Sequence, residues 1–181
     1  MADIIIENIV STTKLTDDLD IQQLANNMEN SKYEPNEFPG LIFHYSKPNT
    51  VAFLFPNGKL VCTGAKNIKD AENAINKTKN NIQDSGVYTV KELEIEIQNI
   101  VSSSDLGRKL NLKSIADSQL FENVEYTPEE FPGLVYKMDD LGMMSILFES
   151  GKIVITGAKK LEDATLSINK IEDKLSSMEF L

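Results

Sequence analysis

The sequence predicts an α+β protein made of two tandem, pseudo-symmetric copies of one unit, each an antiparallel sheet with helices on one side. Three observations lead to this prediction. Motifs of the first half return in the second half, and both halves show the same order of strand-like and helix-like segments. The strand segments are apolar on both faces, whereas the longer helices are apolar along one stripe only.

The repeat is visible as matched words in the two halves. Ile-Glu-Asn-Ile-Val-Ser (6–11) returns as Ile-Gln-Asn-Ile-Val-Ser (97–102), an offset of 91 residues. Glu-Phe-Pro-Gly-Leu (37–41) and Thr-Gly-Ala-Lys (63–66) return at an offset of 93 residues, so a loop before Tyr33 is two residues longer in the second copy. We therefore place the repeats at 1–90 and 91–181. A duplication that serves stability alone, without a shared site, is the alternative.

Each copy contains the same predicted elements. Period-two patterns and hairpin turns predict strands at 4–10, 41–45, 51–55 and 59–63, and again at 93–101, 134–138, 144–148 and 152–156. Short helices are expected at 20–28 and 111–120. A longer helix closes each copy, and its apolar stripe contains Ile68, Ala71, Ile75, Thr78 and Ile82 in the first copy and Leu161, Ala164, Ile168, Ile171 and Leu175 in the second.

The strands carry more apolar surface than the helices can cover. Val51, Phe53 and Phe55 alternate with Ala52 and Leu54, so both faces of that strand are apolar or small. The same holds for the matched strand at 144–148, which contains Met144, Ile146 and Phe148. One broad apolar face is left over in each copy, and a face of this kind marks a binding surface.

Charge and arginine content argue against common modes of nucleic-acid binding. The 181 residues include 18 basic and 28 acidic side chains, giving a net charge of −10, which by itself disfavours a nucleic-acid ligand. The charge is uneven, at −3 for residues 1–90 and −7 for residues 91–181. The single arginine, Arg108, nearly excludes bidentate readout of guanine.

Other features point to an intracellular protein without a catalytic centre or cofactor. One cysteine, Cys62, excludes an internal disulfide and fits a reducing compartment. The sequence has no run of about 20 apolar residues and no basic leader, so we expect a cytoplasmic protein that does not enter a membrane. His44 is the only histidine, which makes a metal site improbable, and no catalytic constellation is recognisable.

Two kinds of ligand could cover the apolar face. One is a protein partner, a second copy in a homodimer, or a small molecule bound by an acidic module of this type. The other is the minor groove of A·T-rich DNA, where Val, Ile, Thr and Phe meet sugar edges and Asn donates to base acceptors. Asn8 and Asn99 hold matched positions in the first strands, with Val10 and Val101 on the same face.

These residues resemble the core domain of the TATA-binding protein family over residues 4–175. The resemblance is carried by Asn-Ile-Val (8–10 and 99–101), Phe-Pro-Gly (38–40 and 131–133), Phe-x-x-Gly-Lys (55–59 and 148–152) and Thr-Gly-Ala-Lys. It implies a saddle, in which one curved antiparallel sheet from both repeats carries its helices on the convex face. It also implies a general transcription factor that bends the minor groove of the TATA box.

The resemblance assigns roles to individual residues. Phe38, Phe55, Phe131 and Phe148 match the four phenylalanines that wedge between base steps. The other DNA-facing positions match Asn8, Val10, Phe53, Lys59, Val61, Thr63, Asn99, Val101, Ile146, Lys152, Val154 and Thr156.

The resemblance also implies partners beyond promoter DNA. Glu129 and Glu130 match the loop that contacts transcription factor B, which in turn leads to RNA polymerase. The acidic composition, with His44 and Lys137 where nuclear members tend to carry arginine, indicates an archaeal type. An acidic ligand-binding or dimerisation module that uses the same sheet face remains the alternative.

Overall fold

The computed structural model describes residues 3–178, and in that part the chain is an α+β protein of ten antiparallel strands and four helices. This confirms the predicted fold class. The chain divides into two compact units. We call residues 8–98 the N-terminal unit, and residues 99–178 together with 3–7 the C-terminal unit. No helix within residues 3–178 is long and apolar enough to cross a membrane.

The N-terminal unit has the strand order β2-β3-β4-β5-β1, with every neighbouring pair antiparallel. Its elements, the first of which begins in the other unit, are β1 (Ile5–Lys14), α1 (Ile21–Asn26), β2 (Ser31–Lys32), β3 (Leu41–Ser46), β4 (Asn49–Leu54), β5 (Lys59–Ala65) and α2 (Ile68–Asp84).

The C-terminal unit repeats this arrangement with the order β7-β8-β9-β10-β6. Its elements, the first of which begins in the other unit, are β6 (Glu96–Asp105), α3 (Leu112–Ala116), β7 (Val124–Glu125), β8 (Leu134–Met138), β9 (Met143–Leu147), β10 (Lys152–Ala158) and α4 (Leu161–Ser177).

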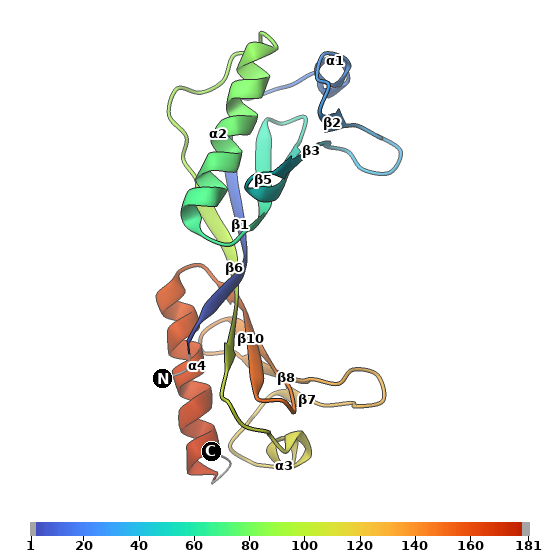
Figure 1. Cartoon of the computed structure of the whole chain (residues 1–181). Coiled ribbons are helices and arrows are strands. Elements are labelled where there is room, and N and C mark those ends of the chain that lie inside the picture. The colour runs from blue at the N-terminus through green and yellow to red at the C-terminus, as the bar shows by residue number, and fades with distance from the viewer. Residues whose placement is uncertain (1–2, 179–181) are drawn as a thin grey trace. The chain divides into compact units, whose positions relative to one another are not determined.

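One long helix covers one face of the strands in each unit (Figure 1): α2 packs on β4 and β5, and α4 packs on β10. In the N-terminal unit, Asn67 caps the start of α2, since its side-chain oxygen accepts a hydrogen bond from the Asp70 amide at 2.8 Å. The predicted stripe of α2 is buried from Ala71 to Ile82, but its first member, Ile68, is 52% exposed because it lies in the first turn.

The first strand of each repeat is longer than predicted. β1 continues to Lys14, four residues beyond the expected end, and β6 continues to Asp105. The segments that extend them are rich in Ser and Thr, and these small side chains are buried within the strands rather than forming loops. The short helices are, in turn, shorter than expected, ending at Asn26 and Ala116.

The two repeats exchange the beginnings of their first strands. Residues 3–7 belong to the C-terminal unit, where Ser103 Oγ donates to Glu7 Oε1 at 2.6 Å and Ser104 Oγ donates to the Asp3 carbonyl at 3.1 Å. The start of β6 lies in the N-terminal unit, where Gln98 Nε2 donates to Thr12 Oγ1 at 2.8 Å. The compact units therefore follow the contacts of the two strands rather than the repeat boundary in the sequence.

Candidate nucleic-acid interface

The N-terminal unit has an apolar sheet face that the helix leaves accessible. In β4, Ala52 and Leu54 are completely buried, whereas Val51 and Phe53 are half-buried and so is the following Phe55. The cross-strand register pairs Val51 with Thr63 and Phe53 with Val61, so these residues share one face. We call this surface, with Val10 of β1, the N-terminal open face.

The C-terminal unit has a matching face. Ile153 and Ile155 are buried on the helix side, and the half-buried Val154 and Thr156 alternate with them. The register pairs Met144 with Thr156 and Ile146 with Val154, while Met144 is 37% exposed. We call this surface, with Phe148 and Val101, the C-terminal open face. The alternation predicted from the sequence is therefore present in both units.

Asn8 is held at the edge of a β-bulge by two hydrogen bonds. The Gly64 amide donates to Asn8 Oδ1 at 2.6 Å, and Asn8 Nδ2 donates to Thr63 Oγ1 at 2.9 Å. The strand register shifts between Ile9 and Ser11, and Gly64 has a φ of +98°. A Cβ at Gly64 would lie 2.9 Å from the Asn49 carbonyl oxygen, so both the backbone angle and the space favour glycine.

Asn99 repeats this arrangement in the C-terminal unit. The Gly157 amide donates to Asn99 Oδ1 at 2.7 Å, and Asn99 Nδ2 donates to Thr156 Oγ1 at 3.0 Å. Because a backbone N–H can only donate, the carbonyl oxygen of each asparagine must face the bulge. Each amide nitrogen is left with a second hydrogen, and hence with a capacity to donate beyond the protein. The sequence predicted the matched positions of the two asparagines but not their hydrogen bonds to glycine amides. The signal that could have found these bonds is the glycine in each copy of Thr-Gly-Ala-Lys, which is Gly64 in the first and Gly157 in the second.

Each open face ends at a phenylalanine pair that combines a loop residue with a strand-end residue. Phe38 and Phe55 have ring centroids 5.6 Å apart, and Phe131 and Phe148 have centroids 6.1 Å apart. The glycine of each Phe-Pro-Gly loop makes room for the pair, since a Cβ at Gly133 would lie 2.7 Å from Phe131 Cε1 and 3.2 Å from Phe148 Cε1. The structure thus brings together residues that are 17 positions apart in the sequence.

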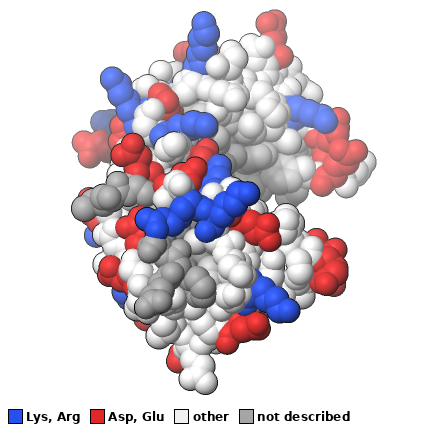
Figure 2. Space-filling view, turned by 60° about the horizontal axis from the view of Figure 1, so that its bottom comes forward, with Lys and Arg blue, Asp and Glu red and all other residues white. Residues whose placement is uncertain are grey.

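The charges beside the two faces differ. Lys59 of the N-terminal unit is opposite Lys14, whereas the matched Lys152 is opposite Asp105 and lies 3.9 Å from Glu7. Lys14 pairs with Asp17 at 2.8 Å, and the hydrogen bond from this pair raises the pKa of Lys14. Figure 2 shows acidic and basic side chains interspersed on the face that it presents.

The loops before the two Phe-Pro-Gly segments are acidic. Glu129 and Glu130 are exposed, and the Glu130 amide donates to the Thr127 carbonyl at 2.9 Å. In the N-terminal unit, a hydrogen bond between Glu34 and Glu37 lowers the pKa of Glu34 and raises that of Glu37. These loops carry negative charge next to both phenylalanine pairs.

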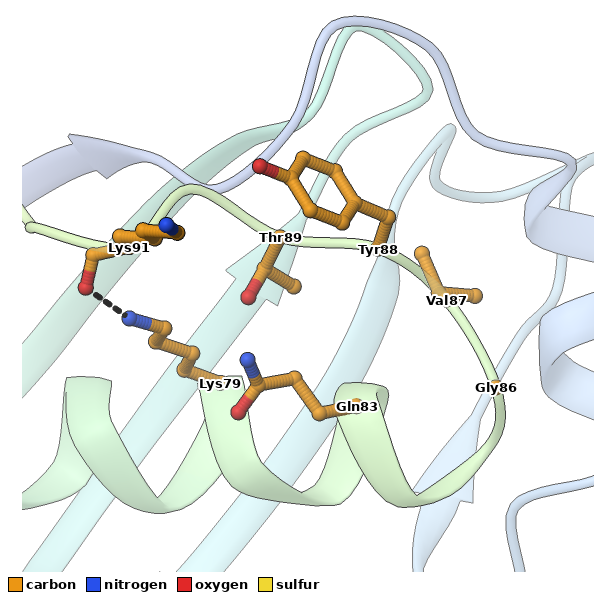
Figure 3. Close-up of a pocket in the computed structure, with 7 residues that line it drawn as sticks. All are labelled: Lys79, Gln83, Gly86, Val87, Tyr88, Thr89 and Lys91. Carbon is orange, nitrogen blue, oxygen red and sulfur yellow. Dashed lines mark hydrogen bonds between the residues drawn. The ribbon is translucent and has the colours of Figure 1, made fainter.

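A separate hollow of about 580 Å³ lies between α2 and the segment that leads to β6 (Figure 3). Lys79 Nζ donates to the Lys91 carbonyl at 2.8 Å and so ties the helix to this segment. The ring of Tyr88 is 77% exposed there. His44, on β3, is exposed, and residues 3–178 contain no cluster of His, Cys, Asp and Glu that could hold a metal ion.

The family model, the relatives and the solved structure that match this chain all carry the name of one family, the TATA-binding proteins. The family model described as transcription factor TFIID, or TATA-binding protein, matches residues 3–85 and 94–178. The TATA-box-binding protein of Methanothermobacter thermautotrophicus is 45% identical over 99% of this chain and 98% of its own length. That of Natronomonas pharaonis is 43% identical over 97% of this chain and 94% of its own. A solved structure, Methanococcus jannaschii TBP, matches with a TM-score of 0.89 and 43% identity, over 97% of this chain and 99% of that one.

Proposed function

Because the chain belongs to the TATA-binding protein family, we propose that it binds the minor groove of a TATA box with its two open faces, bends the duplex and recruits the transcription machinery. The family consists of general transcription factors and not of enzymes. In this proposal the repeats at 1–90 and 91–181 each supply half of the DNA-binding surface. The observation that carries it is the pair of open apolar faces, each with an oriented asparagine and a phenylalanine pair.

The chemistry of the faces suits A·T-rich DNA. The minor groove of A·T pairs offers acceptors only, whereas a G·C pair adds the guanine amino group, which is a donor. The outward N–H of Asn8 or Asn99 would meet an acceptor in the first case and a competing donor in the second. The half-buried Val10, Val61, Val101 and Val154 provide apolar contact with sugar edges without asking for hydrogen bonds.

Phe38, Phe55, Phe131 and Phe148 would enter base steps at the two ends of the bound site. TATA-binding proteins are themselves the type example of this wedging and kinking, so the step is carried over from the family. Unstacking costs a few kcal/mol per step. Burial of the apolar faces must offset that cost, because the net charge of the chain is −10 and Lys152 lies 3.9 Å from Glu7.

Glu129 and Glu130 support the proposal of a protein partner. Both are exposed next to Phe131, where bound DNA would begin to bend, and their charge suits a basic partner. We assign this loop to transcription factor B, through which RNA polymerase is recruited. The proposed location is the nucleoid in the cytoplasm, and the proposed mechanism uses no cofactor or metal.

The proposal is tested by a gel-shift titration of Phe148→Ala and Phe55→Ala on a TATA duplex and a scrambled duplex. Each variant should lose most of its affinity for the TATA duplex while keeping the circular dichroism spectrum of the parent protein. Leu166→Ala, which removes an exposed apolar side chain of α4, is the control and should bind normally. Unchanged affinity of both phenylalanine variants would contradict the wedge assignment, and equal retention of both duplexes by the parent would favour the ligand-binding alternative.

The proposed contact of Glu129 and Glu130 with transcription factor B is tested by a second gel shift. Adding transcription factor B to the TATA complex should produce a slower band, and a Glu129→Lys, Glu130→Lys double variant should weaken that band without changing binding to DNA alone. Loss of DNA binding in the double variant would instead place these residues in the DNA interface.

A further inference from the structure

Phe53 and Ile146 hold matched places in the two units, but only one of them is aromatic. Phe53 is opposite Val61 in the sheet register, and Ile146 is opposite Val154. Both side chains are half-buried on the open face of their unit. The two surfaces also differ at the matched Val51 and Met144, but Phe53 and Ile146 are the pair that differs by an aromatic ring.

The ring of Phe53 changes how the loop phenylalanine is held. Phe38 has an edge contact with Phe53, at a centroid distance of 5.4 Å, and a tilted contact with Phe55, at 5.6 Å. Within residues 3–178 its counterpart Phe131 has one aromatic neighbour, Phe148, at 6.1 Å. Phe131 is also 39% exposed, whereas Phe38 is half-buried.

Ile146 offers the loop of its unit an aliphatic contact. Its Cγ2 lies over the loop glycine, since a Cβ added at Gly133 would be 2.6 Å from that atom. At the matched Gly40, the nearest atoms belong to Phe38, Leu54 and Phe55, and not to Phe53. The isoleucine therefore lies beside Phe131 but offers it no aromatic ring, whereas Phe53 contacts Phe38 ring to ring.

We propose that Phe53 positions Phe38 and thereby makes the two ends of the bound DNA unequal. This inference rests on the proposed function. The end that the N-terminal unit contacts accepts a stiff base step, and the end that the C-terminal unit contacts requires a flexible pyrimidine–purine step. The ring of Phe38 is already held by two neighbouring rings, so it loses less conformational freedom when it enters a base step. More of the binding free energy is then left to offset unstacking. Base steps differ in the cost of this deformation, and TA steps are among the most flexible.

The affinity test uses three TATA duplexes that carry a flexible TA step at both ends, at one end, or at neither. The parent protein should bind the first two with similar affinity and the third more weakly. Phe53→Ile installs the residue of the matched position, and it should lower affinity for the one-ended duplex about 3- to 10-fold, the range expected for losing an aromatic edge contact. Ile146→Phe should instead improve binding to the duplex without flexible ends.

Orientation provides a second readout, from a DNA-cleaving reagent tethered to an introduced cysteine. Asn57→Cys and Ser150→Cys place the tether in the matched turns after Phe55 and Phe148, and the native Cys62 is fully buried. On the one-ended duplex, the tether at residue 57 should cleave beside the stiff end and the tether at residue 150 beside the flexible end. The double variant Phe53→Ile, Ile146→Phe should reverse both patterns.

The outcomes separate this inference from the proposed function. Circular dichroism and thermal melting confirm folding of each variant, and Phe53→Leu provides a second substitution without the ring. If the parent protein does not distinguish TATA from scrambled duplex, the proposed function fails. If the parent binds TATA selectively, but the folded variants keep its end preference and its cleavage pattern, Phe53 has no such role and the function stands.

Discussion

Cys62 shows how a single side chain reports on the packing under α2. The thiol is completely buried on the helix side of β5, and burial raises its pKa to about 11. An unfolded thiol ionises near pH 8.5, so between these two values the unfolded state loses a proton that the folded state keeps. The free energy of unfolding should therefore fall as pH rises above about 8.5, by at most about 1.4 kcal/mol at pH 9.5.

Urea unfolding under reducing conditions at pH 7 and pH 9.5 measures this effect. Cys62→Ala is the control, because it removes the titrating group with little change in volume and should lose the corresponding part of the pH dependence. An identical pH dependence in the parent and in Cys62→Ala would show that other groups cause it.

Single residues also mark the limit of what sequence could predict about the site. Val61, Thr63 and Phe55 could be assigned to one face because a strand has a period of two. The bonds of Asn8 to Gly64 and Thr63 could not, because they form at a bulge that shifts the register. The contact of Phe38 with Phe53 depends on how a Pro-Gly loop folds back, and no periodicity describes a loop.

At the scale of elements, the two long helices differ in how they begin. α2 starts after Asn67, whose side chain caps the Asp70 amide, whereas the matched residue before α4 is Lys160, which makes no capping bond. A lysine at this position also places positive charge at the positive end of the helix dipole. Lys160→Asn should therefore stabilise the protein by about 1 kcal/mol.

Thermal unfolding of Lys160→Asn and of the reciprocal variant Asn67→Lys measures this difference. The first should melt at a higher temperature than the parent and the second at a lower one, while TATA binding at low temperature stays unchanged in both. A lower melting temperature for Lys160→Asn would mean that the lysine makes a stabilising contact that outweighs a cap.

Elements with strong periodicity were predictable, and those defined by tertiary contacts were not. The stripe of α2 and the span of β8 agree with the sequence pattern because one apolar face dictates each of them. The two-residue strands β2 and β7 were missed, since they exist only through pairing with β3 and β8. The extra length of β1 was missed because buried Ser and Thr resemble a loop when only the sequence is read.

For the molecule as a whole, two properties oppose each other when no DNA is bound. The open faces present apolar side chains such as Phe131 and Met144 to solvent, which favours association with a second copy. The net charge of −10 repels that copy. Because salt screens the repulsion but not the apolar contact, we expect the free protein to be monomeric at low salt and to dimerise as salt increases.

Sedimentation equilibrium across a salt series, with and without a TATA duplex, tests this expectation. The duplex should dissociate the dimer, since both would use the same faces. Met144→Glu should abolish dimerisation because it places a charge on the C-terminal open face, whereas Leu166→Glu, at an exposed apolar position of α4, should leave it intact. The reverse result would assign the association to the helices, and the open faces would then be free for DNA at any salt concentration.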